Sequence, residues 1–130
     1  MNTKKSVLIG SVIGIIIAVL PVALAKLNAA WDNETLQSII NFIASVPTLI
    51  LGAKLNLPQV LQNILFFGYW ALTGAAIAWL MARKKPAFKI AAVICLIALI
   101  FIHRTVQVNL ERELEDALRA LGEIFAGKVK

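Results

Sequence analysis

The chain has 130 residues, 60% of them hydrophobic, with a net charge of +6 and a mean hydropathy of +0.84. This composition excludes a water-soluble globular domain, because so much apolar surface needs lipid to cover it. The positive charge does not indicate nucleic-acid binding, since the basic residues flank apolar runs instead of gathering with aromatic side chains on one soluble surface. We therefore expect an all-α integral membrane protein that contacts the lipid bilayer and binds no nucleic acid.

Residues 6–25 form the first apolar run and follow Lys4 and Lys5. About twenty residues of helix cross a hydrocarbon core of about 30 Å, so this run is long enough to span. A cleaved secretory signal is the alternative, because Pro21 and the small residues after it imitate a cleavage site, although the run is longer than a usual signal core. Because basic residues resist translocation, we expect a retained span with a cytoplasmic N-terminus.

Residues 38–58 are harder to place, because their apolar part is short for a crossing and Pro47 interrupts it. We expect a Pro-broken re-entrant or interfacial segment, with a fourth span as the alternative, and no straight helix through the proline. Asp32 or Asn33 is the candidate N-cap ahead of it. Irregular backbone at membrane depth must be buried in protein or line a cavity. The candidate cavity-lining residues are the polar ones of this segment: Asn41, Ser45 and Thr48.

Residues 60–82 give the clearest span, and the basic residues Arg83, Lys84 and Lys85 mark its cytoplasmic end. Small residues recur at helical spacing on one face of this span and on one face of the first span. Such faces let two helices approach closely in lipid. The predicted helix-packing residues are Gly10, Gly14, Gly68, Ala71, Gly74, Ala75 and Ala78.

Pro86 separates this helix from a third span at residues 87–103, which runs back outward. His103 is expected at the membrane exit with its ring facing water. The transmembrane bundle would then occupy residues 1–105, and residues 106–130 would form an extramembrane amphipathic helix. Apolar residues recur along that helix at the spacing of a coiled-coil seam. The predicted partner-docking residues are Leu110, Leu114, Ala117, Leu121 and Ile124.

The sequence offers no catalytic or metal-binding constellation, because it has one histidine and one cysteine. We predict no catalytic residue, no cofactor and no metal. The interiors of the three predicted spans contain no Asp, Glu, Lys or Arg. Ion-coupled transporters generally need such charged side chains inside the membrane, so the sequence does not favour a transporter. We therefore expect a structural or accessory subunit, with the C-terminal helix docking on a second copy in a homo-oligomer or on a partner in a larger membrane complex. An oligomeric pore or holin-like permeabiliser is the alternative.

Overall fold

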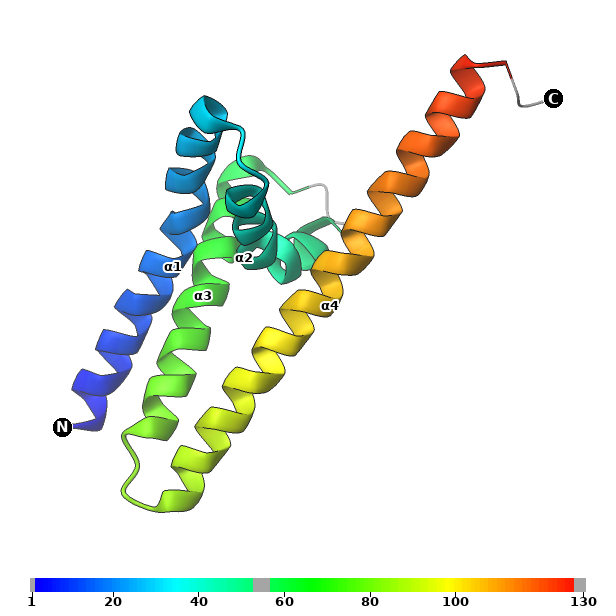
Figure 1. The fold of residues 1–130 in the computed structure, drawn as a ribbon. Coiled ribbons are helices and arrows are strands. Elements are labelled where there is room, and N and C mark those ends of the chain that lie inside the picture. The colour runs from blue at the N-terminus through cyan, green and yellow to red at the C-terminus, as the bar shows by residue number, and fades with distance from the viewer. Residues whose placement is uncertain (1, 53–56, 128–130) are drawn as a thin grey trace.

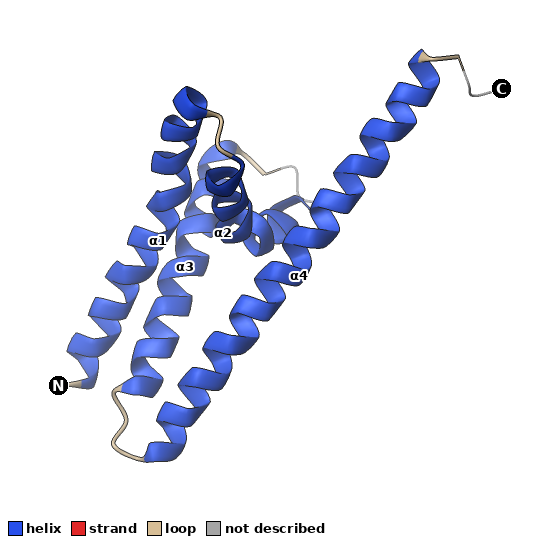
Figure 2. Cartoon of the chain, in the orientation of Figure 1, coloured by secondary structure: helices blue, strands red, loops and turns tan. Residues whose placement is uncertain are grey.

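The computed structural model of the chain describes residues 2–52 and 57–127, leaving out the side chains of residues 48–52. Within these ranges the chain consists of helices joined by short turns, with no strand (Figure 1, Figure 2). The helices are α1 (Thr3–Trp31), α2 (Glu34–Gly52), α3 (Gln59–Met81) and α4 (Pro86–Phe125). The predicted all-α fold class is confirmed.

Three of the described helices, α1, α3 and α4, are long and apolar enough to cross a membrane. They contain the three predicted spans, so the prediction of three such helices is confirmed. Helix formation follows from the apolar runs themselves, because in lipid every backbone N–H and C=O must find its partner within the segment. This is an all-helical fold consistent with a membrane location.

A tight turn joins α1 to α2. Helix α1 continues past the predicted end of the first span to Trp31, and Asp32 then adopts the left-handed conformation at φ 45°. The Asp32 N–H donates to the carbonyl of Asn28 at 2.8 Å, which ends α1. Asn33 Oδ1 accepts the N–H of Thr35 at 2.9 Å, so Asn33 is the N-cap of α2.

Helix α2 is not interrupted at Pro47, so the predicted break there is wrong, whereas the predicted re-entrant or interfacial position of this segment stays a prediction. It runs from Glu34 to Gly52 with Pro47 inside it. Figure 1 shows its ribbon turning toward α4 in the second half. A proline removes one N–H and crowds the carbonyl four residues earlier, and a bend relieves that crowding without ending the helix.

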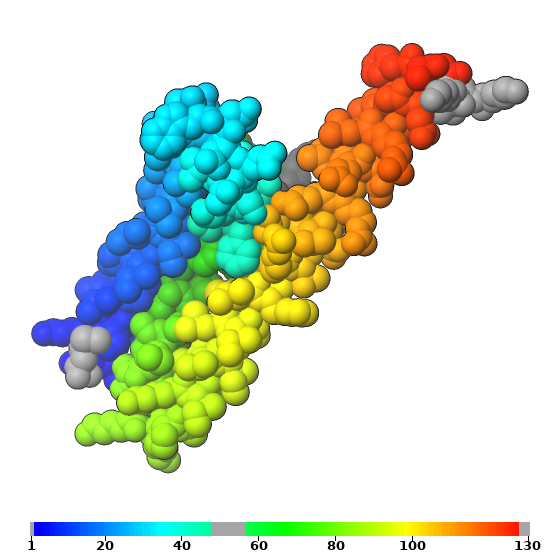
Figure 3. All heavy atoms as spheres, in the orientation of Figure 1, coloured from blue at the N-terminus to red at the C-terminus, as the bar shows by residue number. Residues whose placement is uncertain are grey.

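Helix α4 is one continuous 40-residue helix from Pro86 to Phe125, so the third predicted span and the predicted C-terminal amphipathic helix belong to the same helix. The membrane boundary at residue 105 stays a prediction. At the expected exit point, Thr105 Oγ1 donates to the carbonyl of Phe101 at 2.9 Å, so this polar side chain is accommodated inside the helix. Figure 3 shows the C-terminal part of α4 extending beyond the other helices.

The helices are arranged around α3. Helix α1 packs along α3 more extensively than any other pair of described helices, and α2 contacts both α1 and α4. Helix α4 also contacts α3, but α1 and α4 do not contact each other within the described ranges. The buried apolar cluster contains Ala18, Ile43 and Trp70, one residue from each of α1, α2 and α3.

One end of the bundle carries the whole excess of positive charge. Figure 1 shows the N-terminus and the α3–α4 turn at the same end. The basic residues of this end are Lys4, Lys5, Arg83, Lys84, Lys85 and Lys89, and their six charges equal the net charge of the chain. The seven acidic residues lie elsewhere, at positions 32 and 34 and between positions 111 and 123. The rest of the chain is therefore neutral.

Candidate functional site

The main polar site lies where α2 meets α4. On α4, His103, Gln107 and Glu111 follow one another at four-residue spacing and therefore share a face. They meet polar residues of α2, including Ser45. His103 is 0% exposed, and Gln107 and Ser45 are each 2% exposed, which is unusual for polar side chains.

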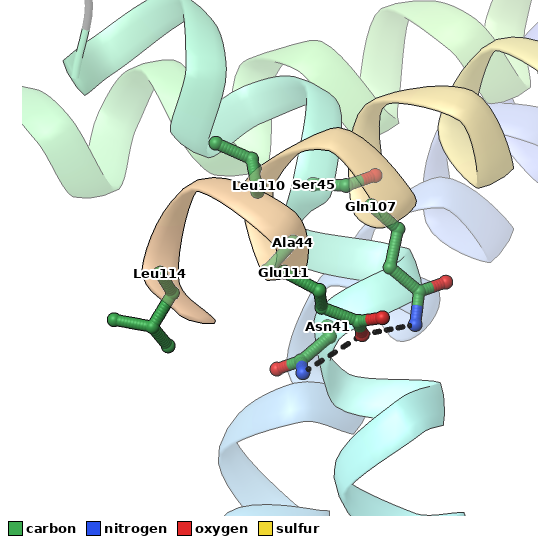
Figure 4. Close-up of a pocket in the computed structure, with 7 residues that line it drawn as sticks. All are labelled: Asn41, Ala44, Ser45, Gln107, Leu110, Glu111 and Leu114. Carbon is green, nitrogen blue, oxygen red and sulfur yellow. Dashed lines mark hydrogen bonds between the residues drawn. The ribbon is translucent and has the colours of Figure 1, made fainter. Parts of the chain in front are cut away.

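The outer part of this site is a hydrogen-bond network around Glu111. Its Oε1 accepts from Gln107 Nε2 at 2.9 Å and from Asn41 Nδ2 at 3.4 Å (Figure 4). Gln107 Nε2 also lies 3.3 Å from the carbonyl and the hydroxyl oxygen of Ser38. Arg104 donates to Gln107 Oε1 at 3.1 Å. The Glu111 carboxylate is therefore held by donors from both helices.

The network continues from α2 to the end of α1. Gln37 Nε2 donates to Asn41 Oδ1 at 2.9 Å, and Asn28 Nδ2 donates to Gln37 Oε1 at 3.0 Å. A continuous series of amide side chains therefore joins α1, α2 and α4 at this end of the bundle.

The inner part of the site is built around His103, whose expected water-facing position is wrong. Its Nδ1 lies 2.8 Å from the carbonyl of Phe42, and its Nε2 lies 2.9 Å from the hydroxyl of Tyr69. A carbonyl can only accept, so Nδ1 carries the proton and Nε2 accepts from Tyr69. The rings of Phe42, Tyr69 and Trp70 surround the imidazole, with centroids 5.1–5.9 Å away. The side chain is buried because α2 and α3 both pack against α4 at this point and each supplies one of its partners, Phe42 from α2 and Tyr69 from α3.

Ser45 completes the inner part. Its hydroxyl donates to the carbonyl of Phe42 at 2.8 Å, and its oxygen also lies 3.2 Å from His103 Nδ1. The arrangement joins α2, α3 and α4 through neutral hydrogen bonds. Within the described residues, no three His, Cys, Asp or Glu side chains are grouped so that they could hold a metal ion.

A cavity of about 180 Å³ opens between α2 and α4 (Figure 4). Of the candidate cavity-lining residues, Asn41 and Ser45 line it, and the side chain of Thr48 lies outside the described part of the chain. Leu110 and Leu114 of the predicted docking seam line it as well. The remaining seam residues, Ala117, Leu121 and Ile124, are exposed.

The small residues of α1 and α3 lie at a close contact between these helices. A Cβ atom at Gly14 would overlap the backbone of Trp70 and lie 3.0 Å from the N atom of Ala71. A Cβ atom at Gly10 would overlap Gly74 and Ala78. Ala75 is half-buried.

Gly68 does not belong to this contact, since a Cβ atom there would meet nothing within 4 Å. The predicted packing residues of α3 follow one another at alternating three- and four-residue steps, from Gly68 to Ala71, Ala75 and Ala78. The contact row on α3 instead advances by four residues, from Ala78 to Gly74 to Trp70, as helix ridges do when they pack together. Gly68 therefore lies off the row.

The sequence interpretation missed Tyr69, His103, Gln107 and Glu111 as members of one site. The available signal was the four-residue spacing of polar residues on α4 opposite polar residues at helical spacing on α2. The predicted membrane exit at residues 103–105 assigns His103 to a span and Gln107 and Glu111 to an extramembrane helix, which conceals the face that they share.

Comparisons with known protein families, with curated proteins and with solved structures find no match. The class that the fold defines is therefore an all-helical protein with three described helices able to cross a membrane.

Proposed function

We propose that this protein is a structural or accessory subunit of a membrane complex, acting through helix–helix contacts and docking a partner on the outer part of α4. The observation that carries this proposal is the apolar stripe on that part, which the bundle leaves uncovered. Leu114 is 61% exposed and Phe125 is 87% exposed. A contiguous exposed apolar surface of this kind is typical of an interaction site. The large residues of the stripe are Leu114, Leu118, Leu121, Ile124 and Phe125.

The charges beside the stripe favour a particular partner. By helical geometry, Glu113 lies along one edge of the stripe and Glu115 along the other. Acidic edges disfavour an anionic lipid surface, which attracts Lys and Arg. They also disfavour a parallel second copy, because like charges would face each other across the contact. We therefore expect a different polypeptide with an apolar groove bordered by basic residues.

The alternative of an oligomeric pore receives less support from the polar groups at membrane depth. Thr73 Oγ1 donates to the carbonyl of Tyr69 at 2.7 Å, and the Ser45 hydroxyl donates to the carbonyl of Phe42. These hydroxyls are satisfied inside the protein, whereas a water-filled path would need polar groups facing its lumen.

Replacing Leu114 and Leu121 together by Asp is expected to release the partner, because two carboxylates would enter an apolar contact. The measurement is co-purification from native membranes in mild detergent, with the assembled mass determined by light scattering. An unchanged set of companions at an unchanged mass would contradict docking through this stripe. A loss of self-association alone would identify a homo-oligomer and contradict the different partner.

The matched control replaces Arg112 and Arg119 by Asn. This pair has the same seven-residue spacing, changes the charge by the same amount and lies on the opposite face of α4. We expect the control to retain the partner.

The orientation is the second part of the proposal, because six basic residues at one end favour a cytoplasmic position for that end. In a Cys95→Ala background, we expect Glu113→Cys to react with a membrane-impermeant thiol reagent in intact cells. Lys5→Cys and Lys85→Cys should both react only after permeabilisation. If Lys85→Cys but not Glu113→Cys reacts in intact cells, the proposed orientation is wrong and the basic end faces outward.

A further inference from the structure

A cavity of about 350 Å³ lies at the basic end of the bundle. Its apolar wall includes Ile9 of α1 and Met81 of α3, and its charged wall is formed by Arg83, Lys84 and Lys89. The cavity is therefore apolar on one side and cationic on the other.

A second cavity of about 210 Å³ adjoins this one, because Gly10, Ile13 and Ala78 line both. The second cavity extends along α1 and α3 as far as Trp70 and reaches Leu99 on α4. Helix α4 forms its third side, where α1 and α4 do not contact each other in the described ranges. The two adjoining cavities are together called the amphipathic groove below: its first part is lined by three cations and its second part by mainly apolar side chains.

The charges of this end have no acidic counterpart nearby. The first acidic residue of the chain, Asp32, follows the far end of α1, and the next after Glu34 is Glu111. Six cations without a carboxylate among them attract an anion. A second transmembrane helix in the groove would leave these charges uncompensated unless it brought acidic residues of its own.

Arg83 is positioned by two aromatic rings. Its Cζ atom lies 4.3 Å from the ring centroid of Trp79 and 5.9 Å from that of Phe88. Stacking on a ring face holds the guanidinium plane and leaves its N–H edges free to donate. Two parallel N–H donors match the oxygens of a phosphate.

We propose that the amphipathic groove binds an anionic phospholipid of the adjoining leaflet. Its phosphate contacts Arg83, Lys84 and Lys89, and one acyl chain lies along the apolar part toward Trp70. A soluble phosphate compound would use only the cationic wall, whereas a phospholipid uses both parts of the groove. The shared lining of the two cavities therefore favours the lipid over a free anion.

The test measures phospholipid retained by the purified full-length protein in native mass spectrometry, with phosphatidylglycerol or phosphatidylcholine added in detergent. We expect preferential retention of phosphatidylglycerol. The variant Arg83→Gln, Lys84→Gln, Lys89→Gln should weaken that retention about tenfold or more, because three cationic contacts to one phosphate are lost.

The matched control is Lys4→Gln, Lys5→Gln, Lys85→Gln. It removes the same charge from the same end but changes no residue lining either cavity. It should retain phosphatidylglycerol as the unmodified protein does, which would assign binding to the groove and not to the general field of the basic end. Equal losses in the two variants would overturn the proposal.

Two further outcomes would also overturn it. Equal retention of phosphatidylcholine and phosphatidylglycerol would show that the cations do not select the headgroup. Displacement of the lipid by equimolar glycerol 3-phosphate would show that the apolar part of the groove is not used.

Discussion

Replacing Gly14 by Leu is expected to separate α1 from α3 and to lower the thermal unfolding midpoint in detergent. The nearest atoms to a Cβ at this position belong to the backbone of Trp70 and Ala71. A change of rotamer cannot relieve an overlap with backbone, so the two helices must move apart. We expect a loss at or above the upper end of the about 1–3 kcal/mol typical of overpacked sites.

Gly68→Leu is the matched control, because it makes the same substitution in a helix of the same bundle. A Cβ at Gly68 meets nothing within 4 Å, so the change should stay within about 0.5 kcal/mol of the unmodified protein. If the two substitutions lower the unfolding midpoint equally, the close contact of α1 and α3 is not the cause of the destabilisation.

Replacing His103 by Leu is expected to loosen α2 from the bundle. The imidazole is fully buried and is the partner of the Tyr69 hydroxyl and the Phe42 carbonyl. With leucine at position 103, the Tyr69 hydroxyl and the Phe42 carbonyl both lose their hydrogen bond to the imidazole in an apolar environment. A buried polar group that loses its hydrogen bond typically costs about 1–3 kcal/mol. The measurement is again thermal unfolding in detergent.

A double-mutant cycle with Tyr69→Phe separates the hydrogen bond from the packing of the ring. Because the two side chains share one hydrogen bond, we expect the double variant to lose less than the sum of the single losses, by about 0.5 kcal/mol or more. Additive losses would indicate that the two residues act independently. Thr105→Val is the control on α4, because its exposed hydroxyl bonds only to Phe101 of the same helix, and we expect it to be nearly neutral.

The three helices that are able to cross a membrane could be predicted because each depends on a local property. In lipid, a long apolar segment forms a helix whatever its neighbours are, because a helix satisfies the backbone hydrogen bonds within the segment. The ends of α1 and α2 were harder to predict, because Asp32 and Asn33 are both suitable at a helix boundary. Only the backbone conformation assigned the end of one helix to Asp32 and the cap of the next to Asn33.

The continuity of α4 could have been predicted from the residues that end helices. The sequence has no Pro or Gly between Pro86 and Gly122, and the change from apolar to charged residues near His103 does not itself break a helix. A change from apolar to polar residues indicates where a helix meets water, whereas Pro, Gly and capping side chains indicate where the helix ends.

The candidate site could be predicted only in part. Asn41 and Ser45 stood out because they interrupt an apolar segment. Their partners on α4 lie 58 to 70 residues away along the chain, and pairing them requires the register between helices. That register depends on packing, and the error at Gly68 has the same origin.

The unbroken α4 also has a mechanical consequence. Its 40 residues form a rod about 60 Å long, which α2 and α3 hold as far as Glu111 and whose C-terminal part is uncovered. A change of about 10° in the inclination of the whole bundle would therefore displace the tip of α4 by about 10 Å relative to its basic end. Transmembrane helices alter their inclination when the thickness of the surrounding bilayer changes. In a bilayer, the distance that the Leu121 end of α4 reaches would then vary with the bilayer thickness.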